Sequence, residues 1–77
     1  MNTKTLAVGD AVESVVTIPG RKPIITRGKV SALMDVEGHP YARFVLCDGR
    51  PGFTTLAAIG AKGQTPPAGA IAFYRLA

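Results

Sequence analysis

The chain has 77 residues, a net charge of +4, a single cysteine and 47% hydrophobic residues. This length allows one domain and no second core, and eleven of the hydrophobic residues are alanine, so we expect a thin core. The hydrophobic content is too high for a disordered tail, and Gly and Pro interrupt every apolar run well before the roughly 20 residues that span a bilayer. We therefore expect one soluble globular domain over residues 1–77, with no membrane association.

The single cysteine and the first residues of the chain indicate the cellular compartment of the protein. Cys47 is alone and cannot form an internal disulfide, and residues 1–4 do not lead into an apolar signal core. Both features favour the cytoplasm. The basic charge favours polyanionic partners.

The apolar pattern predicts strands, because nine Gly and six Pro leave no window with the apolar stripe of a helix. The stretches rich in β-branched and alternating apolar residues predict five short strands, at residues 11–18, 24–34, 41–47, 53–56 and 70–76. Gly28 lies in the middle of the second strand, where it indicates a bulge or a tight bend.

The intervening segments complete the organisation. Residues 19–23 and 61–69 read as exposed loops, residues 35–40 as a polar turn, and residues 48–52 as a hairpin connection. Residues 56–59 tighten into one helical turn, and residues 1–7 form a flexible N-terminus. Five strands in an unbroken meander predict an all-β fold, a small closed or nearly closed barrel of the SH3-like type.

Short motifs carry a resemblance to known families. Gly9-Asp10-Ala11-Val12, followed by Gly28-Lys29-Val30 and a helical turn before the last strand, resembles the start of KOW-type SH3-like barrels. With Leu56-Ala57-Ala58-Ile59, the same motifs also resemble type II dihydrofolate reductases, whose SH3-like subunits form tetramers around a central pore.

The resemblance to type II dihydrofolate reductases does not extend to the residues of their active site. That family carries Val-Gln-Ile-Tyr in the strand before the helical turn, where this chain has Phe53-Thr54-Thr55-Leu56. The residues that contact nicotinamide and folate are missing. We therefore assign no catalytic residue and no cofactor from this family, and reductase activity remains a remote alternative.

No other motif predicts an enzyme. His39 lies in a turn and Cys47 on an apolar strand, and neither belongs to a metal-binding or nucleophilic pattern, so both read as structural. No phosphate loop or catalytic triad is visible. We expect a protein without catalytic, metal or cofactor sites.

The cations suggest a function. Arg27 and Lys29 share one face of the second strand, because side chains repeat every two residues. A basic surface on a small barrel is typical of DNA or RNA binding through phosphates, with Tyr41 or Tyr74 as stacking groups. The predicted nucleic-acid-binding residues are Arg21, Lys22, Arg27, Lys29, Arg43 and Arg50. A merely solvated basic face is the alternative.

An apolar outer surface suggests a second function. If Arg43 and Arg75 face water, then Ala42, Phe44, Leu46, Ala72, Tyr74 and Leu76 point inward. Large apolar residues on the same faces as the arginines then remain outside, namely Tyr41, Val45, Ile71 and Phe73. If their two strands are neighbours, these four form a patch for a protein partner or for a homo-oligomer. Alternatively, the strands of so small a barrel bend enough to bury both faces at some positions.

Overall fold

The computed structural model describes residues 6–77, which form one antiparallel sheet of five strands and one turn of 3-10 helix. The elements in chain order are β1 (Ala11–Val16), β2 (Ile24–Val36), β3 (His39–Leu46), β4 (Pro51–Thr55), η1 (Leu56–Ala58) and β5 (Ala72–Leu76). The predicted all-β fold with five strands and one helical turn is thereby confirmed. Within these residues no helix has the length and hydropathy to cross a bilayer.

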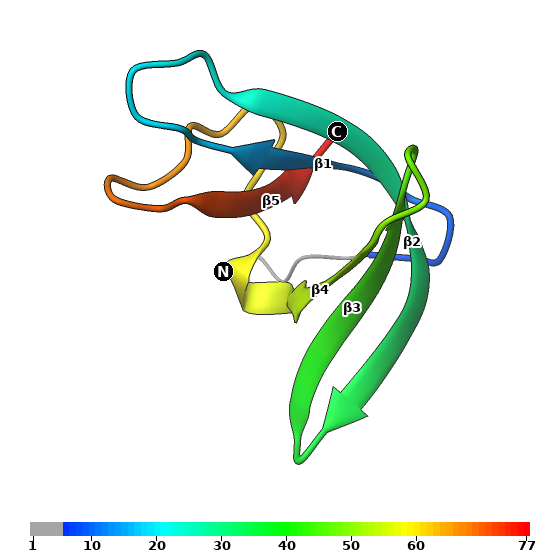
Figure 1. The fold of residues 1–77 in the computed structure, drawn as a ribbon. Helices are drawn as coiled ribbons and strands as arrows, with labels where there is room; N and C mark the ends of the chain where they lie inside the picture. The colour runs from blue at the N-terminus through cyan, green and yellow to red at the C-terminus, as the bar shows by residue number, and fades with distance from the viewer. Residues whose placement is uncertain (1–5) are drawn as a thin grey trace.

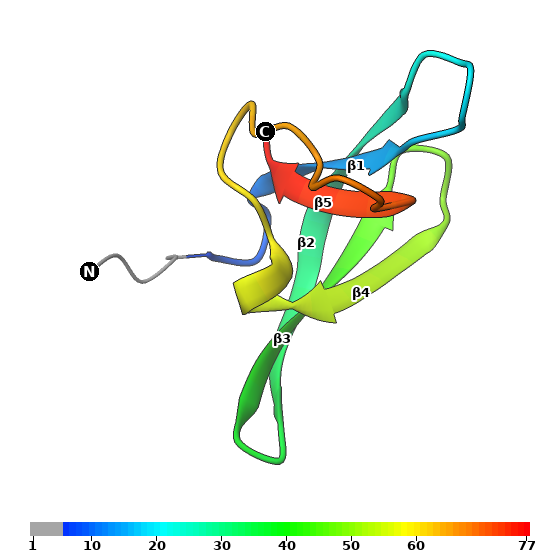
Figure 2. The same ribbon diagram turned by 90° about the vertical axis from the view of Figure 1, so that its left-hand side faces the viewer.

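The sheet curls into a half-barrel, with strand order β4-β3-β2-β1-β5 (Figures 1 and 2). The edge strands β4 and β5 are not paired with each other. Instead, the chain after η1 runs along β5, where Gly60 donates its N–H to the Tyr74 carbonyl and accepts a hydrogen bond from the Leu76 N–H. The barrel is therefore closed on the β5 side by this segment and open towards β4.

The β2–β3 hairpin is longer than predicted and protrudes from the rest of the molecule (Figures 1 and 2). Its turn has only two central residues, Glu37 and Gly38, with φ of 52° and 84°. Two successive positive φ angles are what a type I′ turn requires. Pro40 is tolerated in β3 because it lies beyond the part that pairs with β4, where β3 has a neighbour on one side only.

The bulge in β2 lies between Val30 and Ala32, where the register with β3 shifts. Gly28 pairs regularly, so the prediction of a bulge at this residue is wrong. The physical reason for glycine is close packing against β3. A Cβ at Gly28 would lie 2.8 Å from the Leu46 Cδ2 and 2.9 Å from the Val45 carbonyl oxygen.

The concave side of the sheet holds the hydrophobic core. Five buried side chains form its centre, from β1, β2, β3 and the residue after η1: Val12, Val30, Ala42, Phe44 and Ile59. Leu6, Leu56, Tyr74 and Leu76 pack against them. The core is as thin as the sequence predicts, and its only ring pair, among the residues described, joins Phe44 and Tyr74, with centroids 4.8 Å apart and ring planes tilted by 45°.

The predicted inward faces of β3 and β5 are correct with one exception. Ala42, Phe44 and Leu46 are buried, and Tyr74 and Leu76 pack on the core. Ala72 is exposed. It is the first residue of β5 and pairs with the last residue of β1, so it lies at the rim of the sheet, where nothing covers it.

The convex side of β5 is covered by the chain that follows η1. Phe73 lies in contact distance of Gly60, and the Arg75 guanidinium donates a hydrogen bond of 2.9 Å to the Gln64 carbonyl. Val15, directly opposite Phe73 on β1, is buried although it faces away from the main core. At this end the sheet therefore buries both of its faces.

Residues 1–5 of the predicted flexible N-terminus lie outside the described residues. Leu6 packs against the core, and the Ala7 N–H donates a hydrogen bond of 2.8 Å to the Asp10 carboxylate. The chain is thus held at the point where it enters β1.

Candidate functional site

The convex side of β2, β3 and β4 brings cations and aromatic rings together. Directly opposed residues of antiparallel strands lie on the same face, and Lys29 is opposite Val45 while Arg43 is opposite Phe53. The six residues that define this surface, which we call the basic–aromatic face, are Arg27, Lys29, Tyr41, Arg43, Val45 and Phe53. It includes four of the residues predicted from sequence to bind nucleic acid or to stack on it.

The aromatic part of the face is a stacked pair. The rings of Tyr41 and Phe53 are nearly parallel, with centroids 4.8 Å apart and an interplanar angle of 11°. Tyr41 is half-buried, whereas Phe53 is 50% exposed. Sequence reasoning missed Phe53, because its place opposite Arg43 depends on the register across the β3–β4 turn, which the predicted connection at residues 48–52 does not give.

Tyr74, the other predicted stacking group, lies at the margin of this surface, where it borders the same hollow as Arg43 and Phe53. Its ring lies on the concave side, packed on Phe44. That Tyr74 stacks on a base stays a prediction, since its ring packs on Phe44 and also borders this hollow.

The cations of the face differ in whether they are neutralised. Glu13 on β1 pairs with Arg75 at 2.8 Å and with Arg27 at 3.7 Å. The Arg27 side chain nevertheless remains 69% exposed. Lys29 and Arg43 are exposed, and neither forms an ion pair with any residue between 6 and 77. Both are free to meet an anion from solvent.

Arg50 belongs to the β3–β4 turn and is already engaged there. Its guanidinium bonds the Asp48 carboxylate at 2.6 Å, and its backbone N–H donates to the same carboxylate at 3.1 Å. The backbone N–H is the main cause that lowers the pKa of Asp48, and the guanidinium adds to it. Arg50 therefore brings less free charge to the surface than Lys29 or Arg43.

Arg21 and Lys22 lie in the β1–β2 loop, at the end of the molecule opposite the protruding hairpin (Figure 1). Both are exposed, and neither has an ion-pair partner among the residues described. The loop leads directly into β2, the strand that carries Arg27 and Lys29. Arg21 and Lys22 therefore lie near these two cations along the chain, and not beside the aromatic pair.

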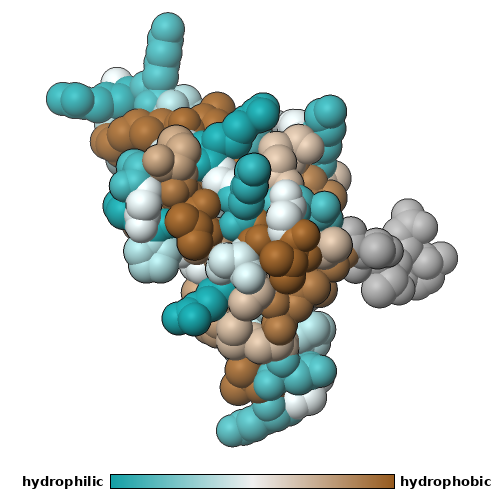
Figure 3. Space-filling model, turned by 90° about the vertical axis from the view of Figure 1, so that its right-hand side faces the viewer, coloured by the Kyte–Doolittle hydropathy of each residue, from teal (hydrophilic) through white to brown (hydrophobic). Residues whose placement is uncertain are grey.

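Two shallow hollows adjoin the basic–aromatic face. One, of about 380 Å³, has walls from Arg27, Lys29 and Val45 together with Cys47. The other, of about 660 Å³, borders the free edge of β4 and has Arg43 and Phe53 in its wall. Figure 3 shows hydrophobic and hydrophilic side chains interspersed on one side of the molecule, above the protruding hairpin.

The four residues predicted as an outer patch are not brought together. Tyr41 and Val45 lie on β3, whereas Phe73 lies on β5 and Ile71 just before it. β2 and β1 separate these strands. The condition for a single patch, that the strands be neighbours, is therefore not met, and Phe73 is half-buried beside Gly60. Ile71 remains 73% exposed.

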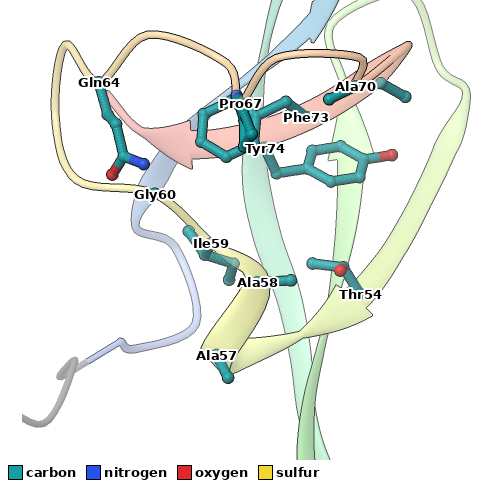
Figure 4. A pocket seen from close by; sticks show the side chains of 11 residues that line it. Thr54, Ala57, Ala58, Ile59, Gly60, Gln64, Pro67, Ala70, Phe73 and Tyr74 are labelled. Atoms are coloured by element: carbon teal, nitrogen blue, oxygen red, sulfur yellow. The ribbon is translucent and has the colours of Figure 1, made fainter.

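A cavity of about 480 Å³ occupies the seam between η1, β4 and β5 (Figure 4). Its polar side chains are those of Thr54, Gln64 and Tyr74, and the Gln64 side-chain oxygen already accepts a hydrogen bond from the Ala61 N–H. None of the described residues that line it carries an acid, a base or a thiol. Across residues 6–77, no three His, Cys, Asp or Glu side chains group as a metal site would require.

Comparison of the chain with protein-family models, with curated proteins and with solved structures finds no match. The resemblances to KOW-type domains and to type II dihydrofolate reductases therefore stay predictions. What the chain does must be argued from its own surface.

Proposed function

We propose that the chain is a small, non-enzymatic nucleic-acid-binding module and that the basic–aromatic face is its binding surface. The observation that carries the proposal is the placement of two unpaired cations on the face of the exposed Phe53 ring: Arg43 lies directly opposite Phe53, and Lys29 lies on the next strand, opposite Val45. Cations that contact phosphates, next to rings on which bases stack, are the usual composition of such surfaces.

The acidic residues support this placement, because none opposes the unpaired cations. Glu13 is neutralised between two arginines, and Asp48 is paired with Arg50. The Asp10 carboxylate accepts a hydrogen bond from the Ala7 N–H, before β1 begins. Asp35 and Glu37 lie at the far end of the β2–β3 hairpin. A phosphate that approaches the middle of β2 and β3 therefore meets an excess of positive charge.

Lys29→Gln tests the proposal with least disturbance to the fold. Lys29 makes no ion pair among the described residues, whereas a charge reversal at Arg27 would place a carboxylate opposite Glu13 and destabilise β1 and β2. Binding of a fluorescent DNA strand should weaken about five- to tenfold at about 50 mM salt, and the slope of log K against log salt should fall by about 0.7.

Lys62→Gln is the matched control, since Lys62 lies in the loop at residues 61–69, away from β2 and β3, and the substitution changes net charge equally. We expect it to affect affinity by less than about twofold, as a remote charge does under salt screening. Equal losses from both variants would show that net charge alone drives binding and would contradict the proposed surface.

The alternative function is a protein-interaction or structural module that self-associates. It is favoured by the exposure of Val45 and Phe53, 51% and 50%, on one side of the sheet. If this surface joins two copies, light scattering of the nucleic-acid-free protein should give a dimer mass that falls with dilution. Val45→Asp should then shift the mass to that of a monomer.

A further inference from the structure

The stacked pair on the basic–aromatic face leaves one aromatic surface open. Tyr41 covers one side of the Phe53 ring at 4.8 Å, and half of the Phe53 side chain remains exposed. The hollow of about 660 Å³ at the edge of β4 borders this ring and Arg43. A planar group can therefore stack on Phe53 while a phosphate attached to it contacts the guanidinium opposite.

The curvature of the sheet disfavours a rigid partner. The basic–aromatic face lies on the convex side of the half-barrel (Figures 1 and 2). Duplex DNA is straight over the length of so small a protein, because its persistence length is about 50 nm. A straight duplex contacts a convex surface over a short length only. A flexible single strand can follow the curve and reach Arg27, Lys29 and Arg43 in turn.

The protruding hairpin also argues against a duplex. A two-stranded ribbon can enter the major groove of duplex DNA. Its tip then lies between two phosphate backbones, so the tip must not be negatively charged. Here Asp35 and Glu37 lie at the tip, and no Lys or Arg occurs between Met34 and Ala42. The hairpin would therefore be repelled from a groove.

We infer that the surface takes single-stranded nucleic acid in preference to a duplex, with the Phe53 ring as the stacking platform for an unpaired base. The inference rests on the proposed nucleic-acid-binding function and specifies its substrate class. Bases in a duplex are already stacked and paired, so the Phe53 ring contributes only to the binding of a strand whose bases are free.

The experiment measures binding by fluorescence anisotropy at about 50 mM salt, with a mixed-sequence DNA strand of about 15 nucleotides and with the duplex it forms with its complement. The wild-type protein should bind the single strand at least about fivefold more tightly. Phe53→Ile, which keeps a strand-forming apolar residue but removes the ring, should weaken single-strand binding about fivefold or more and leave duplex binding unchanged.

Two further variants separate the role of the ring from that of the fold. Phe53→Tyr retains the aromatic face and should preserve the preference. Ile71→Ala removes an exposed apolar side chain that does not belong to the basic–aromatic face and should change neither affinity. Circular dichroism of each variant verifies that the sheet is intact.

The possible failures are distinguishable. Equal, salt-sensitive binding of both forms that does not depend on Phe53 would overturn the inference and leave the proposed function in place. Absence of binding to either form at low salt would overturn the proposed function and the inference with it. A loss of single-strand affinity in Phe53→Tyr as large as in Phe53→Ile would also contradict stacking.

Discussion

Gly28 shows how closely β2 and β3 approach at the centre of the sheet. It pairs with Val12 on one side and Leu46 on the other, and its backbone contacts leave no room for a Cβ. The neighbours of that missing atom are a side-chain methyl and a backbone carbonyl oxygen, and the carbonyl cannot move without breaking the register. Glycine is therefore required here by packing and not by a turn.

Gly28→Val should lower the free energy of unfolding by about 2 to 3 kcal/mol, since overpacking of this kind typically costs 1 to 3 kcal/mol. Urea denaturation followed by circular dichroism measures the loss. The control is Ala11→Val, which places the same valine side chain at an exposed strand residue and should change stability by no more than about 0.5 kcal/mol. Equal stability of Gly28→Val and the wild type would show that β2 and β3 do not pack this closely at Gly28.

At the scale of elements, the segment after η1 acts as a cover for the convex side of β5. Gly60 bonds both Tyr74 and Leu76 through its backbone and lies against the Phe73 ring. This contact turns an outward-facing residue into a half-buried one. It also explains why the large residue at Phe73 needs neither a partner protein nor a second copy to be covered.

Phe73→Ala should therefore destabilise the single chain by about 2 kcal/mol, roughly half the cost of the same truncation at a fully buried site. The loss should be the same at two protein concentrations tenfold apart, as urea denaturation can measure. Ile71→Ala, at an exposed neighbouring residue, should have an effect within about 0.5 kcal/mol. A loss for Phe73→Ala that shrinks as the protein is concentrated would instead place Phe73 in an interface between copies.

The elements were predictable from sequence to within two or three residues, because each strand has a clear run of β-branched or alternating apolar residues. The hairpin of β2 and β3 is two residues longer on each strand than predicted, since the turn at Glu37 and Gly38 needs only two residues and Pro40 is tolerated where β3 has one neighbour. The residues around Val30 do not predict the bulge that follows it.

The candidate site was predictable in part for the same reason. Alternation places Arg27 and Lys29 on one face of β2, and Arg43 on the face of β3 that turns out to adjoin it. Phe53 was missed because its position depends on the register across the β3–β4 turn. The contact between Gly60 and the Phe73 ring joins residues that are distant in the sequence, so no local sequence pattern predicts it.

At the scale of the whole molecule, the half-barrel separates three surfaces with different chemistry. The concave side is filled by the thin core, and the convex side of β5 is covered by the chain after η1. The convex side of β2, β3 and β4 remains open and carries the unpaired cations and the exposed ring. The proposed nucleic-acid binding therefore requires this open side.

The most direct test of binding on this side is a two-dimensional ¹H–¹⁵N NMR titration of the protein with a single-stranded DNA of about 15 nucleotides at low salt. If nucleic acid binds on the open side, the amide signals of Lys29, Arg43 and Phe53 shift progressively, while those of residues 61–69 stay in place. Shifts concentrated at the seam cavity around Thr54 and Gln64, or no shifts at any ratio of DNA to protein, would contradict binding on that side.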